Sequence, residues 1–123
     1  MNVLRKILVE KDVSCKSVWF MRQAGRYLPE FREIRSKNKD FIKLCLNSKL
    51  STDITLQPIK RFNLDAAIIF SDILLVPYML GQNVDFKKEG GPKLSNFKFE
   101  NLKNNSPDDF LNKMKPVYDA IKN

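Results

Sequence analysis

The chain has 123 residues, 43% of them hydrophobic and 29% charged, which is the composition of an ordinary globular protein. Its 22 Lys and Arg outnumber its 14 Asp and Glu, for a formal net charge of +8, and it contains no His. No apolar run approaches the roughly 18 residues that a membrane span needs. Glu10 and Asp12 interrupt the basic start of the chain, which argues against a secretory signal or a transit peptide, so a cytosolic location is expected.

Cysteine content and charge restrict the possible partners. Cys15 and Cys45 stand far apart, and a metal site needs three or four ligands, so reduced structural thiols are expected rather than a metal centre. The positive charge permits nucleic acid, an anionic membrane or an acidic small molecule as a partner. Many lysines stand singly, as in KFENLKNN and NKMKPVYDAIKN, and a solvated surface is the better interpretation for those.

The first predicted strand is SVWFM (17–21), a short apolar run typical of a strand buried on both faces. RQAGR follows as a loop. Pro29 is predicted to be the first residue of a helix, where its missing N–H costs nothing. Phe31 and Ile34, three apart, should form the apolar face of that helix.

Two further helices are predicted, over about 39–46 and about 50–62, and Pro58 should kink or shorten the second of them. DAAIIF (65–70) is again short and apolar, and a second buried strand is expected there. QNVDFKKEGGPKL (82–94) has the turn residues of a hairpin or an excursion.

The last predicted helix begins at Ser106, an N-cap serine followed by proline and two acids. It should run to the end of the chain. Its expected apolar positions are Phe110, Leu111, Met114, Val117 and Ile121.

Apolar strands alternating with helices favour an α/β fold built from parallel β/α units. A parallel strand needs a neighbouring strand after its crossover helix, and no strand follows the last predicted helix. Two buried strands are too few for a sheet covered on both faces. Residues 1–123 are therefore predicted to be one incomplete domain, the opening third of something larger.

Candidate site residues lie where the predicted strands end, which is where reactive residues cluster in β/α folds. Arg22 and Arg26 follow the first strand, with Gly25 between them to let a ligand approach the backbone. Arginine matches a carboxylate with two parallel hydrogen bonds, so an anion is the expected ligand; a solvated face is the alternative. Asp72 ends the second strand in apolar surroundings, where it is either a site residue or a helix cap or arginine partner.

Three stretches resemble the N-terminal region of the uroporphyrinogen decarboxylase family: VWFMRQAGRYLPEFREIR, TLQPIKRFNLDAAIIFSDIL and VPYMLGQNVDFKKEGGPKL. The resemblance is collinear over about 16–94. It implies an eight-fold β/α (TIM) barrel, a homodimer, and no metal or organic cofactor. It also implies a carboxy-lyase of cytosolic tetrapyrrole (haem) biosynthesis, which removes the four acetate carboxyl groups of uroporphyrinogen III to give coproporphyrinogen III.

The resemblance also implies roles for individual residues. Asp72 matches the family's central aspartate, which accepts hydrogen bonds from the pyrrole N–H groups, and Arg35 lies at a position that resembles a substrate contact in some members. The family's substrate-binding loop corresponds to Arg22, Gln23, Ala24, Gly25 and Arg26.

A complete barrel needs about 250 residues, so activity of this chain alone is not expected. One alternative is a non-catalytic tetrapyrrole-binding fragment or a remnant of a split gene. Another is a basic nucleic-acid-binding module, although no stacking motif or recognition helix is evident. A related barrel methyltransferase would need metal-ligating His and Cys residues that the sequence lacks. Neither nucleic acid nor a membrane is the favoured partner.

Overall fold

The computed structural model of the chain describes residues 3–18, 25–86 and 91–123. Helices and short strands follow one another along these residues. Their order is α1 (Val3–Val9), α2 (Pro29–Lys37), α3 (Phe41–Cys45), α4 (Ser48–Phe62), α5 (Leu75–Met79), β1 (Val84–Phe86), β2 (Pro92–Leu94), α6 (Glu100–Lys103) and α7 (Pro107–Lys122).

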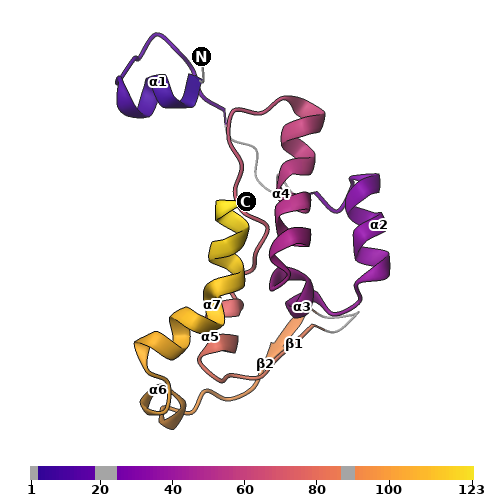
Figure 1. Ribbon diagram of the computed structural model, residues 1–123, viewed down its shortest axis with the longest axis vertical. Coiled ribbons are helices and arrows are strands. Elements are labelled where there is room, and N and C mark those ends of the chain that lie inside the picture. Colours follow the sequence, from indigo (N-terminus) through magenta and orange to yellow (C-terminus); the bar gives the residue numbers. More distant parts are fainter. Residues whose placement is uncertain (1–2, 19–24, 87–90) are drawn as a thin grey trace.

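Helix α4 forms the centre of the arrangement and contacts α2, α3 and α7 (Figure 1). Helix α5 packs on α7, and the β1–β2 hairpin lies beyond α3, at the opposite end of α4 from its C-terminus. Helix α1 stands apart from the other helices. The described chain is therefore helix-rich with a small antiparallel sheet.

Helix starts follow the predicted local chemistry. Pro29 occupies the first turn of α2, and Phe31 is buried, as predicted. Side-chain caps begin the next two helices: Asp40 accepts a hydrogen bond from the N–H of Lys43, and Asn47 caps α4 in the same way.

Helix α4 does not stop at Pro58. The proline is fully buried inside the helix, which continues to Phe62 and ends at Asn63 in the left-handed conformation. The predicted end near residue 62 is therefore confirmed, whereas the shortening expected at Pro58 does not occur. Packing of α4 against three other helices outweighs the roughly 3 kcal/mol that an internal proline costs.

The strand predicted at 65–70 is not a strand in the structure, where residues 66–69 belong to neither a helix nor a strand. Asp65 to Ile68 are exposed and Phe70 is buried, so burial on both faces is also wrong. A parallel strand depends on a neighbour, and residues 19–21 of the first predicted strand lie outside the described residues. Ser17 and Val18, its described part, are exposed and not in a strand.

The hairpin predicted over 82–94 is confirmed. Strands β1 and β2 pair antiparallel, with Val84 opposite Leu94 and Phe86 opposite Pro92. Because the pairing is antiparallel and local, this sheet is no part of the predicted parallel β/α units.

The last predicted helix is confirmed as α7. Ser106 accepts a hydrogen bond from the N–H of Asp109, whose carboxylate bonds back to Ser106 in a capping box. Val117 is buried, but Leu111 and Ile121 are exposed, so only part of the predicted apolar face is covered. Helices α1, α5 and α6 were not predicted, because such short segments carry little periodicity.

The core joins α2, α3, α4 and α7 to the segment that ends at Phe70. The buried rings of Phe31 and Phe70 belong to it, and the half-buried rings of Phe41 and Phe86 pack against it. The Phe31 and Phe41 rings meet the Phe70 ring edge-on at 5.8 and 5.9 Å, and Phe86 packs on Phe41 at 4.7 Å. Among the helices of the described residues, none combines the length and the apolar character needed to cross a bilayer.

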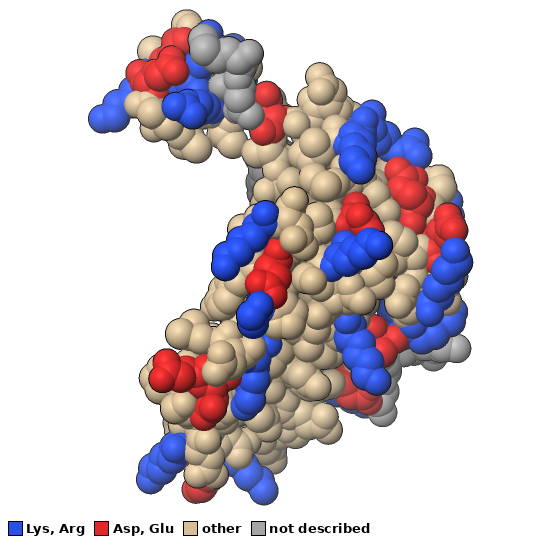
Figure 2. All heavy atoms as spheres, viewed as in Figure 1, with Lys and Arg blue, Asp and Glu red and all other residues tan. Residues whose placement is uncertain are grey.

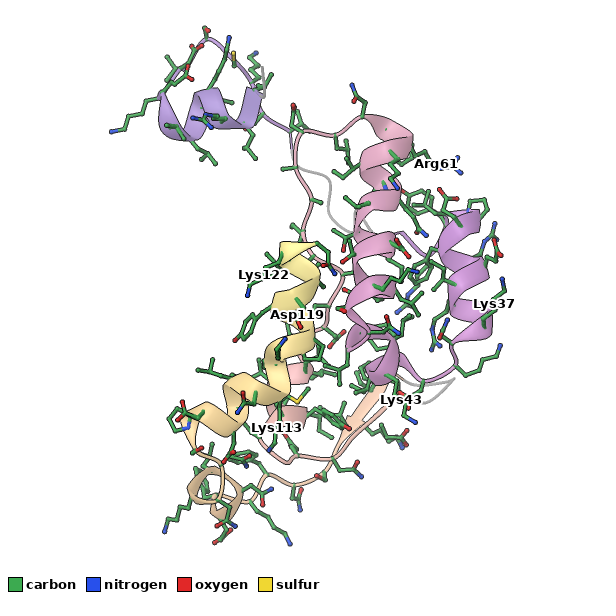
Figure 3. The ribbon with its side chains drawn as sticks, viewed as in Figure 1. Lys37, Lys43, Arg61, Lys113, Asp119 and Lys122 are labelled. Carbon is green, nitrogen blue, oxygen red and sulfur yellow. The ribbon has the colours of Figure 1, made fainter. Side chains whose placement is uncertain are left out.

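Charged side chains are spread over the surface. Figure 2 shows cationic and acidic side chains interspersed on one face, which is hollowed between α1 and α7. The cations labelled in Figure 3 lie on four different helices: Lys37, Lys43, Arg61, Lys113 and Lys122. This distribution agrees with the interpretation of most lysines as solvated surface.

Candidate functional site

Asp72 lies in the short connection between residues 65–70 and helix α5. Its Oδ1 accepts a hydrogen bond from the N–H of Leu74 at 2.8 Å, and its carbonyl oxygen accepts one from the N–H of Leu75 at 3.1 Å. The carboxylate thus closes a local turn that leads into α5. It is not the helix N-cap that the sequence left open beside a site role, because the N-cap of α5 is Leu74, which has no side-chain cap. The second oxygen of Asp72, Oδ2, makes no hydrogen bond with the described part of the chain.

Two residues before Asp72, the backbone of Phe70 is held by two hydroxyl groups of α4. Ser51 Oγ donates to the Phe70 carbonyl at 2.6 Å, and the Phe70 N–H donates to Thr55 Oγ1 at 2.8 Å. The Thr55 hydroxyl in turn donates to the Ser51 carbonyl at 2.7 Å. All three hydrogen bonds are buried. We call this arrangement of Ser51, Thr55 and Phe70 the hydroxyl clamp.

Sequence reasoning missed the hydroxyl clamp. Ser and Thr are common on solvated helix faces, so their presence in a helix does not by itself indicate a buried role. A signal was nevertheless present, because residues four apart share one face of a helix. Ser51 and Thr55 lie on the face of Ile54 and Pro58, and all four residues are buried.

Arg35 lies beside the aromatic rings of the core. Its guanidinium donates a hydrogen bond to the carbonyl of Asn38 and stands 5.7 Å from the centre of the Phe41 ring. The side chain is half-buried at the end of α2. A positive charge is thus held over an apolar surface.

The charges of Arg35 and Asp72 both act on the buried thiol of Cys45. Burial of the thiol, reinforced by the negative charge of Asp72, raises the Cys45 pKa to about 12, and the positive charge of Arg35 acts in the opposite direction. Both charged side chains therefore lie close enough to act on the same buried thiol. Arg35 stands over the Phe41 ring, which meets the ring of Phe70, two residues before Asp72. No ion pair joins Arg35 to Asp72 in the described chain.

The predicted arginine loop is described only in part, because Arg22, Gln23 and Ala24 lie outside the described residues. Gly25 is buried, and its carbonyl accepts a hydrogen bond from the N–H of Leu28 at 3.0 Å. A Cβ atom at Gly25 would lie 2.0 Å from the Tyr27 ring, so any larger residue would displace that ring. Arg26 is exposed, and no hydrogen bond or ion pair in the described chain joins it to Asp72.

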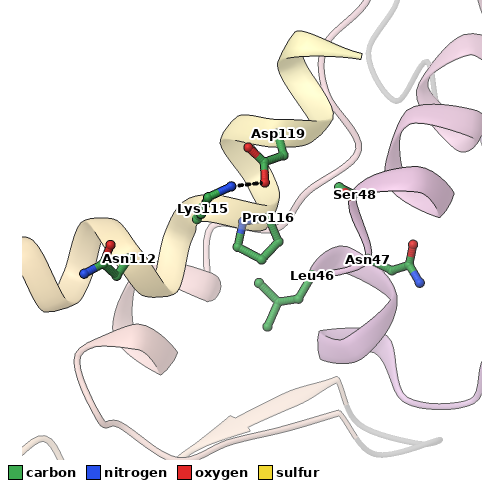
Figure 4. Close-up of a pocket in the computed structure, with 7 residues that line it drawn as sticks. All are labelled: Leu46, Asn47, Ser48, Asn112, Lys115, Pro116 and Asp119. Carbon is green, nitrogen blue, oxygen red and sulfur yellow. Dashed lines mark hydrogen bonds and ion pairs between the residues drawn. The ribbon is translucent and has the colours of Figure 1, made fainter.

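An open depression of about 430 Å³ lies between α7 and the α3–α4 junction (Figure 4). None of the predicted site residues lines it. The ion pair of Lys115 and Asp119, 2.6 Å long, borders it on α7. Its lining residues are Leu46, Asn47, Ser48, Asn112, Lys115, Pro116 and Asp119. Among the described residues, no three His, Cys, Asp or Glu side chains gather as metal ligands would.

The family model and the relatives that match this chain agree on its family. The family model for uroporphyrinogen decarboxylase matches residues 2–123. The chain is 52% identical over 109 residues to the uroporphyrinogen decarboxylase of Rickettsia felis, and 50% identical over 105 residues to that of Rickettsia canadensis. It is 46% identical over 105 residues to the uroporphyrinogen decarboxylase of a Chelativorans species. Each match covers 85% of this chain, but only 30% or 31% of the length of the relative.

Proposed function

The chain belongs to the uroporphyrinogen decarboxylase family, and from this premise we propose that it supplies the N-terminal part of an enzyme that decarboxylates uroporphyrinogen III. The four acetate side chains of the substrate would become methyl groups, giving coproporphyrinogen III. The family match over residues 2–123 is the observation that carries this proposal. Because the chain spans about 30% of the length of its relatives, the activity is assigned to an assembly that includes the rest of the enzyme.

We propose that residues 1–123 form the first part of one eight-fold β/α barrel domain. In that barrel, residues 65–70 would be a parallel strand paired with the strand predicted at 17–21. The continuous apolar run at 66–70 supports this assignment, because strands of a parallel sheet are covered on both faces. The turn at Asp72 would then lie at the carboxyl end of a barrel strand, where active sites of such barrels are built.

In the proposed mechanism, the Asp72 carboxylate stabilises positive charge on a pyrrole ring. When CO2 leaves an acetate side chain, the electron pair of the broken carbon–carbon bond stays behind, and a protonated ring accepts it. A proton then adds to the side-chain carbon to complete the methyl group, and the ring releases the proton that it had accepted, so each acetate loses one CO2 and takes up one proton in total. A fixed carboxylate that accepts hydrogen bonds from the ring N–H groups lowers the energy of the cationic ring. Oδ1 of Asp72 is engaged by Leu74, which orients the group and leaves Oδ2 to face a ligand.

The substrate is polyanionic, and arginines are the matching ligands. We propose that Arg22 and Arg26 bind its carboxylates, together with Gln23, Ala24 and Gly25 of the same loop. Arg35 is proposed as a further contact, supported by its position over the Phe41 ring, which packs on Phe70 two residues before Asp72. No metal or organic cofactor takes part in this proposal. We further propose that the complete enzyme is a cytosolic homodimer.

The proposal is tested by completing the enzyme. A chimera joins residues 1–123 to the part of the Rickettsia felis enzyme that lies beyond the matched region, and its conversion of uroporphyrinogen III is followed by separating the products. We expect coproporphyrinogen III to form, and none to form with residues 1–123 alone. Porphyrinogen binding without loss of CO2 by a folded chimera would instead favour a non-catalytic tetrapyrrole-binding role. The absence of both would contradict the proposal.

A further inference from the structure

The hydroxyl clamp consists of polar groups placed where an apolar helix face would ordinarily be. Ser51 is 1% exposed and Thr55 is 8% exposed. A hydroxyl group in such surroundings is costly unless it is hydrogen-bonded. Two buried hydroxyls four residues apart on one helix therefore need a specific set of partners.

Those partners are the two backbone polar groups of a single residue. The carbonyl of Phe70 accepts from Ser51, and the N–H of Phe70 donates to Thr55. Thr55 can accept this bond because its own hydrogen is directed to the Ser51 carbonyl. Side chains of α4 thus hold Phe70 at both ends of its backbone, as a neighbouring strand would.

The ring of Phe70 is fixed as well, since it packs edge-on against Phe31 and Phe41. Only Ser71 separates Phe70 from Asp72. On its other side, Asp72 is bonded to the first N–H groups of the following turn, those of Leu74 and Leu75. The backbone before Asp72 is therefore held by the hydroxyl clamp, and the Asp72 side chain and carbonyl are held by the turn before α5.

We infer that Ser51 and Thr55 are positioning residues for the proposed reaction: through Phe70 they fix the place of the Asp72 carboxylate relative to the substrate. The inference rests on the proposed role of Asp72. Neither hydroxyl is assigned a contact with the substrate, so both act through the backbone. A displacement of about 1 Å in a reacting group can reduce a rate about 100-fold.

The test uses the chimera and measures kcat and KM. Ser51→Ala and Thr55→Val remove the two hydroxyls, and we expect each to lower kcat by roughly 10-fold to 100-fold with little change in KM. Ser51→Thr and Thr55→Ser, which keep a hydroxyl, should restore most of the lost rate. Thr52→Val is the matched control: its hydroxyl donates to the carbonyl of Ser48 in α4 and to the carbonyl of Ala120 in α7, not to Phe70.

The double variant Thr55→Val with Asp72→Asn tests the hydroxyl clamp separately from the proposed role of Asp72. If the clamp acts through Asp72, Thr55→Val should cause no further loss of kcat in the Asp72→Asn background. If Thr55→Val lowers kcat as much in the Asp72→Asn background as in the unsubstituted chimera, the inference that the clamp positions Asp72 is wrong. The inference is also wrong if Thr52→Val lowers kcat as much as Thr55→Val does. An Asp72→Asn variant with unchanged turnover would overturn the proposed role of Asp72 itself.

Amide hydrogen exchange in the 123-residue chain gives a readout that does not depend on activity. The Phe70 N–H should exchange about 10-fold faster in Thr55→Val than in the unsubstituted chain, because its buried acceptor is gone. Thr52→Val should leave its exchange unchanged. Equal exchange at Phe70 in the unsubstituted chain and in Thr55→Val would contradict the clamp, whatever the kinetic results.

Discussion

At the scale of single residues, the surroundings of each cysteine determine its chemistry. Cys45 is fully buried, and burial together with the nearby Asp72 carboxylate raises its pKa to about 12. Cys15 is partly exposed near Asp12 and Ser14. Only the thiolate form reacts with alkylating reagents, so the two thiols should differ strongly in their rates of alkylation.

We expect iodoacetamide at pH 8 to label Cys15 and to leave Cys45 unlabelled in the folded chain. About one Cys45 thiol in ten thousand is ionised at that pH, as follows from its pKa of about 12. Peptide mass spectrometry after timed labelling measures both rates. Urea should abolish the difference, and equal labelling without urea would show that Cys45 is not buried as described.

At the scale of elements, one ion pair joins two helices that pack on each other. Arg61 near the end of α4 donates two hydrogen bonds of 2.9 Å to the Glu30 carboxylate in the first turn of α2. The other ion pairs of the described chain lie within single helices or helix caps and are more exposed. Hydrogen bonding from Arg61 lowers the Glu30 pKa below its ordinary value of 4.5.

This pKa shift predicts part of the dependence of stability on pH. Because the pKa of Glu30 is lower in the folded chain, the pair stabilises the fold above about pH 4.5, and this contribution is lost as the pH falls through the lowered pKa. Glu30→Gln should therefore make the loss of stability on acidification shallower. Urea unfolding at several pH values tests this. Glu100→Gln is the control, because Glu100 forms no ion pair in the described chain; an identical slope in both variants would contradict the prediction.

The sequence predicted helices better than strands, for a physical reason. Helix starts at Pro29 and Ser106 depend on local proline and capping chemistry, so a single sequence shows them. A parallel strand such as the one predicted at 65–70 is formed by its neighbours, which local sequence does not supply. The continuation of α4 through Pro58 likewise depends on tertiary packing.

For the candidate site, the sequence singles out Asp72, because a carboxylate at the end of an apolar run is unusual, and its role in a site stays a prediction. The structure shows a side-chain turn at Asp72 rather than the helix cap that was the local alternative. Ser51 and Thr55 could not be recognised, because their role depends on Phe70, a residue distant in sequence. The proximity of Arg35 to Cys45 likewise arises only from folding.

At the scale of the whole molecule, the described chain leaves apolar side chains exposed around the candidate site. Ile73 is 87% exposed and Ile68 is 58% exposed, close to Asp72 in the sequence. Exposed apolar groups of this kind favour association. The chain alone should therefore self-associate through this region.

Ile68→Ser combined with Ile73→Ser should increase the monomeric fraction of the 123-residue chain, measured by sedimentation velocity over a range of concentrations. Val13→Ser is the matched control, because Val13 is 95% exposed but lies beyond α1, which stands apart from the other helices. An equal effect of the two changes would indicate nonspecific aggregation. No effect of the paired change would show that the exposed isoleucines do not drive association.

We propose that Asp72 of this chain supplies the carboxylate of a uroporphyrinogen decarboxylase site. The most direct measurement compares kcat and KM of the chimera with those of its Asp72→Asn variant. Asparagine keeps an oxygen that can accept the Leu74 N–H bond, so the turn is retained while the charge is removed. We expect kcat to fall roughly 100-fold to 1000-fold and KM to change far less, as for the loss of a preorganised electrostatic group. Unchanged kcat in a folded variant would contradict the proposal.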